Sequence, residues 1–184
     1  GKQYTVSVDE YSIPAYYEYY TAPKIDPTAY LTAQLTNWEQ YNLLPGDANL
    51  FFEGTYVGKS YIDPVETNDT LQISLGRDNN IVIERTKIKD LQSKSLIGNT
   101  KKMSYGFEIL VRNKKKEAIN IVIEDQVPIT TNKDLEIEVE DISGAKYDKN
   151  KGKLEWKFSL NPAESKKMKL KYNVKYPKDK ILQM

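Results

Sequence analysis

Residues 167–176 read KMKLKYNVKY, and apolar and polar side chains alternate throughout this stretch. The apolar positions are Met168, Leu170, Tyr172, Val174 and Tyr176. Successive side chains of an extended chain point to opposite faces, so a period of two separates one apolar set from one polar set. The stretch therefore predicts a β-strand with one buried face and one face in water.

Four other runs in the C-terminal half show the same alternation. They cover residues 103–111, 119–123, 135–139 and 154–160. Turn-forming residues separate the runs, among them Ser143-Gly144, Asn150-Lys151-Gly152 and Asn161-Pro162. Two facing sheets are the usual way to bury so many one-sided strands. Residues 96–184 are therefore predicted to form an immunoglobulin-like β-sandwich.

The N-terminal half is also rich in strand candidates, although its patterning is less regular. The candidates are residues 4–8, 16–20, 31–35, 50–52, 55–62, 71–75 and 81–88. Five prolines punctuate these runs and argue against a long helix. The weakest pattern lies at residues 92–100, which are predicted to connect two domains. The predicted fold is all-β, with two immunoglobulin-like β-sandwich units in tandem, residues 1–95 and residues 96–184.

Charged side chains form two stripes of opposite sign on the predicted strands. One stripe is Lys167, Lys169, Lys171 and Lys175, and the other is Glu136, Glu138 and Glu140. Opposite charges on paired strands contribute roughly 0.2–1 kcal/mol per pair, so the two strands are predicted to be neighbours in one sheet. The lysine stripe lacks the interleaved aromatic residues of a nucleic-acid surface, and no nucleic-acid partner is expected.

The residue types that the chain lacks bear on catalysis. The chain contains neither histidine nor cysteine, and its net charge is +1. Ser-His-Asp and Cys-His catalysis, disulfides and thiolate metal sites cannot be built from it. We therefore expect no catalytic, cofactor-binding or metal-ligating residues and no enzymatic activity. No apolar run approaches the roughly 18–20 residues of a membrane-spanning helix.

Two groups of carboxylates leave an enzyme open as the least favoured alternative. Glu124 and Asp125 are adjacent, but carboxylate chemistry of the glycosidase kind needs two such groups facing each other across a cleft. The acidic loop at residues 63–69 lacks the alternate-position spacing and the glycine of a calcium-binding EF-hand loop. A solvated turn is the favoured interpretation of this loop.

The segment GTYVGKSY, residues 54–61, ends in the Gly-Lys-Ser triplet of a phosphate-binding P-loop. Only three residues separate Gly54 from Gly58, whereas the P-loop needs four, and Glu53 would repel phosphate at the place of the first glycine. The residues that follow favour a strand rather than the required helix. We predict instead a β-hairpin that turns at Glu53-Gly54, with Gly58 marking a bulge or a close backbone approach.

Four segments carry a resemblance to a known family. They are NLLPGDANLFFEGTYVGKSYIDP (42–64), SLGRDNNIVIERTKIKD (74–90), EDQVPITTNKDLEIEV (124–139) and NPAESKKMKLKYNVKYPKD (161–179). Together they make the chain similar to the C-terminal domain of mucoidy-inhibitor-A-like bacterial proteins, a domain of unknown function. The resemblance implies a β-rich part of a protein in the bacterial cell envelope, periplasmic or at the surface. It brings no catalytic residues.

Tyrosines gather near the N-terminus, where ten of the 14 lie within the first 61 residues. Tyr16, Tyr17, Tyr19 and Tyr20 form the candidate binding surface, although tyrosine is also an ordinary strand residue. The favoured function is a non-enzymatic scaffold that binds a protein partner or self-associates. The alternative is a carbohydrate-binding module in which these tyrosines stack on a polysaccharide.

Overall fold

The computed structural model describes residues 10–52, 54–63, 70–89 and 94–180. These residues form mainly strands and turns, and a 3-10 helical segment covers Trp38–Tyr41 (η1), which confirms the predicted all-β class. The chain divides into two compact units. Unit 1 contains the described residues up to Glu18 and those from Leu31 to Gly76, and unit 2 contains Tyr19–Tyr30 and the described residues from Arg77 onward.

The two units are interleaved along the chain, whereas the sequence pattern predicted consecutive domains at residues 1–95 and 96–184. Strands β1 (Ala15–Ala22) and β2 (Asp26–Thr36) each contribute residues to both units. Of residues 92–100, predicted as the inter-domain connection, the described ones, 94–100, fall within unit 2. There, Lys94–Ile97 form strand β7, which pairs with the start of the following strand.

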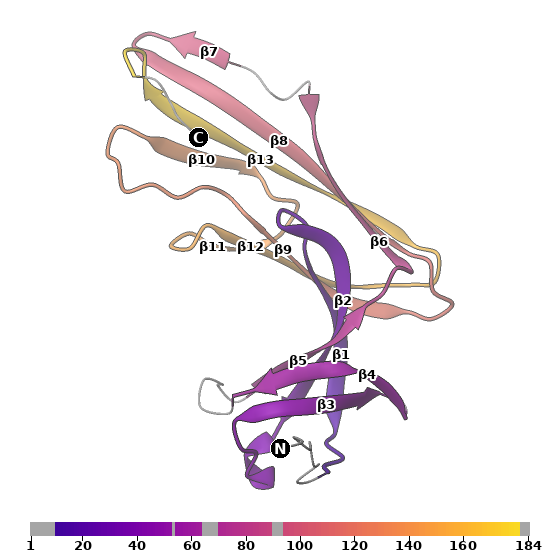
Figure 1. Cartoon of the computed structure of the whole chain (residues 1–184). Helices are drawn as coiled ribbons and strands as arrows, with labels where there is room; N and C mark the ends of the chain where they lie inside the picture. Colours follow the sequence, from indigo (N-terminus) through magenta and orange to yellow (C-terminus); the bar gives the residue numbers. More distant parts are fainter. Residues whose placement is uncertain (1–9, 53, 64–69, 90–93, 181–184) are drawn as a thin grey trace, which may run out of the picture. The chain divides into compact units, whose positions relative to one another are not determined.

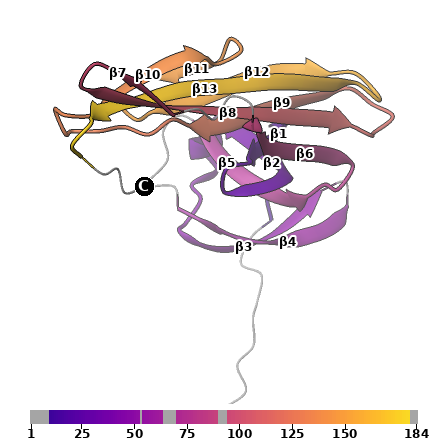
Figure 2. The same ribbon diagram turned by 90° about the horizontal axis from the view of Figure 1, so that it is seen from above.

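Unit 2 is built from two sheets (Figure 1). Its further strands are β6 (Ile81–Lys87), β7, β8 (Thr100–Asn113), β9 (Ile119–Gln126), β10 (Glu136–Asp141), β11 (Lys146–Asp148), β12 (Lys153–Leu160) and β13 (Ser165–Pro177). One sheet has the order β11-β12-β9-β1-β2-β5, in which β5 (Thr70–Arg77) belongs mostly to unit 1, and the other has the order β10-β13-β8-β6 with β7 also paired to β8. Strands β8 and β13 run antiparallel side by side over their whole length (Figures 1 and 2).

The core of unit 2 follows the predicted alternation. Fully buried side chains come from β8 (Ile109, Val111), β9 (Ile121, Ile123), β12 (Leu154, Leu160) and β13 (Met168, Leu170, Val174). The intervening residues on β12 and β13 are mostly polar, whereas Leu110 on β8 and Val122 on β9 are apolar. Each buried aliphatic side chain contributes about 1.5–3 kcal/mol relative to an exposed one. The period of two thus marks a buried face on β12 and β13, while β9 buries three consecutive residues, Ile121 to Ile123.

Unit 1 has a smaller core. Its own strands are β3 (Gly46–Phe52), β4 (Thr55–Ile62) and most of β5 (Thr70–Arg77). The buried cluster consists of Ala33, Leu35, Trp38, Leu71 and Ile73. Leu50 of β3 and Ile62 of β4 pack against this cluster, so the β3–β4 hairpin covers it with one face.

The β3–β4 hairpin confirms both glycine predictions. Phe52 pairs with Thr55, which leaves a two-residue loop, and Gly54 in that loop has a φ of +74°. Leu50 pairs with Gly58 and Phe51 pairs with Tyr56, so β4 contains one extra residue at this point. Gly58 has a φ of +142°, a conformation that side chains other than glycine rarely adopt. This extra residue forms the β-bulge that was predicted from Gly58.

The two charge stripes lie on neighbouring strands, as predicted. Strand β10 pairs with β13, and Glu136 stands directly opposite Lys175. The Lys175 Nζ lies 3.2 Å from Glu138 and 3.6 Å from Glu136. From β8, Lys102 adds a contact of 3.2 Å to Glu140. These pairs fix the register of β10, which lies at one edge of its sheet.

The glutamate stripe predicts an acid-sensitive contribution to stability. Hydrogen bonding to Lys175 and Asn173 lowers the pKa of Glu138, and bonding to Asn173 and Lys102 lowers that of Glu140. A carboxyl group with a lowered folded-state pKa stabilises the fold above its unfolded-state pKa, and this stabilisation is lost as pH falls through the folded-state value. Urea unfolding should therefore show the midpoint falling between about pH 5 and about pH 3.

The double variant Glu138→Gln/Glu140→Gln should flatten this pH dependence, because it removes two of the titrating groups. Glu84→Gln is the matched control, since Glu84 is an exposed glutamate on β6. An equal pH dependence in the double variant and the control would contradict the assignment.

Candidate functional site

The outer side of the β3–β4 hairpin carries three exposed aromatic side chains. Phe51 is 67% exposed, Tyr56 is 52% exposed and Tyr61 is 64% exposed. The same side carries the exposed polar residues Asp47, Asn49 and Lys59. We call the surface made by these six residues the hairpin face. The Phe51 and Tyr56 rings meet edge to face, with centroids 5.5 Å apart.

The bulge at Gly58 is what places the three aromatic residues together. Tyr56 and Tyr61 are five residues apart, and residues an odd number apart in a regular strand point to opposite faces. The extra residue shifts the alternation by one position. As a result Tyr56 stands opposite Phe51, and Tyr61 stands opposite Asp47, two positions of β3 that share one face.

The four tyrosines of the predicted binding surface are divided between the two units. Tyr16 and Tyr17 belong to unit 1 and are 47% and 43% exposed, whereas Tyr19 and Tyr20 belong to unit 2. Tyr17 meets Phe52 edge to face at 5.1 Å. Tyr19 is only 5% exposed, so it belongs to the interior. A role in binding stays a prediction for the exposed pair, Tyr16 and Tyr17.

Tyr19 takes part in a buried polar network of unit 2. Its hydroxyl donates to Asp78 Oδ2 at 2.7 Å and accepts from Lys115 Nζ at 2.8 Å. Burial raises the pKa of the Tyr19 phenol. Burial also opposes the charged form of Lys115, but its bonds to Glu117, Tyr19 and Asp78 outweigh this and raise its pKa. Both groups therefore keep their protons near neutral pH, which suits a structural role.

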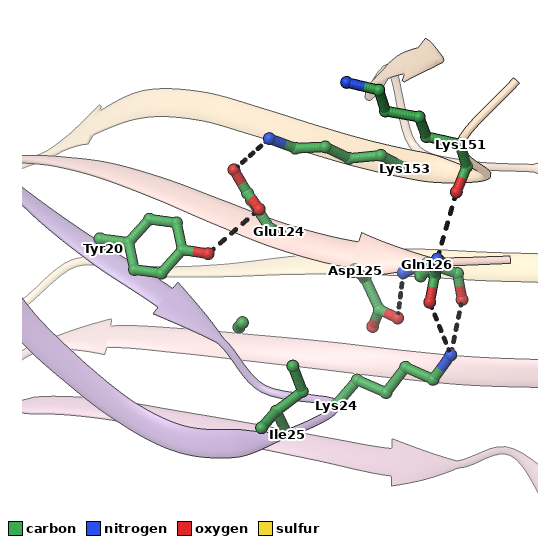
Figure 3. A pocket seen from close by; sticks show the side chains of 9 residues that line it. Tyr20, Lys24, Ile25, Glu124, Asp125, Gln126, Lys151 and Lys153 are labelled. Atoms are coloured by element: carbon green, nitrogen blue, oxygen red, sulfur yellow. Dashed lines mark hydrogen bonds and ion pairs between the residues drawn. The ribbon is translucent and has the colours of Figure 1, made fainter. Parts of the chain in front are cut away.

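A pocket of about 310 Å³ opens in unit 2 where β1, β9 and β12 lie side by side (Figure 3). Tyr20 and Glu124 form one wall, and the Tyr20 hydroxyl donates to Glu124 Oε2 at 3.0 Å. On the other side of the carboxylate, Lys153 Nζ lies 2.5 Å from Oε1. Burial and the neighbouring Glu124 charge raise the pKa of Tyr20 to about 12. We call this cavity the Tyr20 pocket.

The second carboxylate of the pocket region, Asp125, is paired towards the interior. Arg85 of β6 donates to it through Nε at 2.7 Å and through Nη2 at 3.3 Å. The Arg85 guanidinium lies 3.8 Å from the centroid of the Phe107 ring, and the backbone N–H of Gln126 donates to Asp125 at 2.7 Å. The pair joins the two sheets of unit 2, since β6 and β9 belong to different sheets.

Glu124 and Asp125 therefore do not act as a carboxylate pair. They are neighbours in β9 and both line the Tyr20 pocket, but Glu124 bonds to Tyr20 and Lys153, whereas Asp125 bonds to Arg85. Each carboxylate has its own cationic partner.

The acidic loop predicted at residues 63–69 is a separate group of carboxylates. All of it except Asp63 lies outside the described residues.

Two further amines border the Tyr20 pocket. Lys24 Nζ lies 3.5 Å from both the backbone carbonyl oxygen and Oε1 of Gln126 (Figure 3). The Gln126 side chain also donates to the Lys151 carbonyl at 3.1 Å. Of the residues that the structure describes, neither Lys24 nor Lys151 has a carboxylate within ion-pair distance. Sequence reasoning missed this cluster, because its members come from three distant segments.

Comparison with known proteins places the chain in a family. Residues 2–178 match the family described as Domain of unknown function (DUF4139). The chain belongs to this family. The DUF4139 chain is also similar to Protein F37C4.5 of Caenorhabditis elegans, with 24% identity over 190 residues. That alignment covers 95% of this chain and 34% of the nematode protein, so the chain spans about a third of its relative's length.

No solved structure matches the DUF4139 chain. The resemblance to mucoidy-inhibitor-A-like proteins stays a prediction, since these matches show the DUF4139 family and carry no such name. Within the described part of the chain, no helix has the length and apolar character needed to cross a membrane.

Proposed function

We propose that this DUF4139 domain is a non-enzymatic protein-interaction domain, and that it acts as a scaffold in the bacterial cell envelope. The observation that carries the proposal is the hairpin face, where Phe51, Tyr56 and Tyr61 stand exposed on one side of a hairpin whose other side packs on the core. Clustered exposed aromatic side chains are typical of interaction sites.

The composition of the hairpin face favours a protein partner. Phe51 is the most exposed of its three aromatic residues and has no group that can hydrogen-bond to a sugar. Three polar residues surround the rings: Asp47 is acidic, Asn49 carries an amide and Lys59 is basic. An apolar centre with a polar rim is the usual arrangement of protein–protein interfaces. Burying the rings against an apolar partner surface would supply the main favourable term.

The pKa shifts of Tyr20 and Lys115 in unit 2 support the non-enzymatic part of the proposal. Catalytic acids and bases have pKa values shifted toward neutrality, so that they exchange protons at working pH. In this domain the Tyr20 pKa is raised to about 12 and the Lys115 pKa is also raised, both away from neutrality. Such groups hold their protons and fix positions.

Two finer points belong to the same proposal. The two-sheet arrangement of unit 2 supports an immunoglobulin-like β-sandwich there, one of the two such units expected from the sequence. The envelope location rests on the resemblance to mucoidy-inhibitor-A-like bacterial proteins. The nematode relative shows that similar chains also occur in an animal.

Site-specific photocrosslinking tests the proposal. A photoreactive phenylalanine analogue at Tyr56 should give protein adducts in envelope fractions, because this position lies at the centre of the hairpin face. Adding Phe51→Ser should reduce the yield at least about tenfold, the effect of losing one central aromatic anchor. The same analogue at Lys133, an exposed residue of unit 2, is the matched control. Equal adduct yields at both positions, or no effect of Phe51→Ser, would contradict the proposal.

A carbohydrate-binding module is the second candidate, because Tyr16 and Tyr17 are both about half exposed. The same purified domain, incubated with envelope polysaccharide, distinguishes the two functions. Retention that is lost in Tyr16→Ala/Tyr17→Ala and kept in Phe51→Ser would favour the carbohydrate function. Retention of polysaccharide by neither protein would leave the protein-interaction proposal as the stronger.

A further inference from the structure

We propose that the Tyr20 pocket binds a small organic anion, a monocarboxylate with a short apolar chain. The site lies wholly within unit 2 and is distinct from the hairpin face, so it adds a second binding activity to the domain. The inference rests on the Lys24 amine, on the apolar residues of the pocket and on the turn and strand pairing that hold them in place.

The charge balance of the pocket favours an anion. Each of its two carboxylates is paired with a cation, Glu124 with Lys153 and Asp125 with Arg85, and the Tyr20 hydroxyl also donates to Glu124. Within the described part of the chain, the hydrogen-bond partners of Lys24 Nζ are two neutral oxygen atoms of Gln126, both at 3.5 Å, which is long for a hydrogen bond. A carboxylate at this amine would replace two weak contacts with a charge-assisted bond.

The charge of the ligand is limited by Glu124. This carboxylate faces the same cavity, and a doubly charged anion such as phosphate would be repelled by it more strongly than a singly charged one. A cationic ligand would meet the amines of Lys24, Lys151 and Lys153. A single negative charge close to Lys24 is the choice that fits both constraints.

The apolar part of the ligand has a place beside the charged part. Ala22, Ile25 and the ring of Tyr20 line the same cavity, and Ile25 is 87% exposed. Covering the Ile25 side chain would bury apolar surface that water now contacts. A six-carbon acid has eight non-hydrogen atoms and needs roughly 240 Å³ at about 30 Å³ per atom, which fits the cavity of about 310 Å³.

The frame of the pocket is set before a ligand arrives. Lys24 and Ile25 lie in the turn that joins β1 to β2, and the Ile25 N–H donates to the Ala22 carbonyl at 2.9 Å. Pro23 at the second position of this turn restricts its backbone. Strand β1 is held against β9 by parallel pairing of Tyr20 with Val122. A pre-formed site loses little conformational entropy on binding.

Hexanoate is the probe that tests the site, in an NMR titration of the whole chain labelled with ¹⁵N. We expect saturable shifts of the Lys24, Ile25 and Gln126 amide signals at millimolar hexanoate, since so small a ligand binds weakly. Hexanol, which lacks the charge, and acetate, which lacks the apolar chain, should each bind at least about fivefold more weakly. Raising the salt concentration should weaken hexanoate binding, because the Lys24 amine is exposed.

The variant Lys24→Gln should weaken hexanoate binding about tenfold, the loss expected for one charge-assisted bond. Lys116→Gln is the matched control, because Lys116 is an exposed lysine that precedes the opposite end of β9. An unchanged ¹H–¹⁵N spectrum in the absence of hexanoate would show that both variants fold. Absence of saturable shifts in the parent chain, or equal binding by the two variants, would overturn the proposal.

Discussion

Replacing Asp125 by alanine is expected to lower the free energy of unfolding of unit 2 by about 3–5 kcal/mol. The Asp125 side chain is fully buried and that of Arg85 is only 15% exposed, so the variant leaves a nearly buried guanidinium without its counter-charge. The stacked Phe107 ring cannot replace a carboxylate bonded at 2.7 Å. Urea unfolding followed by Trp156 fluorescence measures the effect, since Trp156 is buried in the same unit.

Two further variants separate the lost pair from other causes. Removing both charges with Arg85→Met/Asp125→Leu should recover much of the loss, because a buried ion pair is often replaced by apolar residues at little cost. Glu124→Gln is the matched single change on the neighbouring residue. It should cost less than Asp125→Ala, because the Glu124 and Lys153 side chains are 25% and 40% exposed and glutamine keeps an oxygen that can accept from Tyr20. Similar losses in Asp125→Ala and Glu124→Gln would contradict the assigned role of the pair.

The second large effect is expected at Gly152, between β11 and β12. Its φ is +65°, and a Cβ added there would lie 2.4 Å from the carbonyl oxygen of Val127 and 2.9 Å from Cγ2 of Ile129. The backbone contact cannot relax easily, because the Val127 N–H donates to the Gly152 carbonyl at 2.9 Å. Gly152→Ala should lower the free energy of unfolding by roughly 2–5 kcal/mol, the sum of a left-handed backbone cost and overpacking.

Gly144 provides the matched control for this variant. It has a similar φ of +76°, but an added Cβ would meet nothing within 4 Å. Gly144→Ala should therefore show only the backbone cost of about 1–2 kcal/mol, and the difference between the variants measures the contact with Val127. Equal losses in urea unfolding would show that the close approach at Gly152 has no energetic weight.

The strands could be predicted from the sequence because their side-chain pattern is local. The alternation at residues 167–176 became β13, with Met168, Leu170 and Val174 buried. The neighbouring position of β10 was also predictable, because the glutamate and lysine stripes are complementary. Gly54 and Gly58 predicted the hairpin and its bulge through the backbone conformations that glycine permits.

The interleaving of the two units was beyond sequence reasoning for a physical reason. It depends on the parallel pairing of Tyr19–Thr21 with Ile121–Ile123, residues about a hundred positions apart. The run of tyrosines at 16–20 carries no alternation of polarity, so its buried and exposed members could not be told apart. The burial of Tyr19 and the exposure of Tyr17 follow from their neighbours in space.

The Tyr20 pocket shows the same limit. On the sequence, Glu124, Gln126 and Lys153 are ordinary polar residues of the solvent-facing side of their strands. They become a site only where β9 and β12 are joined by β1 and its turn, which brings Lys24 and Ile25 beside them. Pairing between distant strands is decided by the whole core rather than by any short segment.

Because of the bulge at Gly58, the face on which a side chain of β4 stands depends on the number of residues in the strand as well as on their identity. A relative that lacks the extra residue would keep its aromatic surface only if the two aromatic residues of this strand were four positions apart instead of five. Each single-residue insertion or deletion in this strand therefore moves the residues that follow it to the opposite face of the hairpin. In family alignments, chains with a gap at Val57-Gly58 should also have the two aromatic residues of this strand one position closer together. A chain with only one of these two changes would present a different surface.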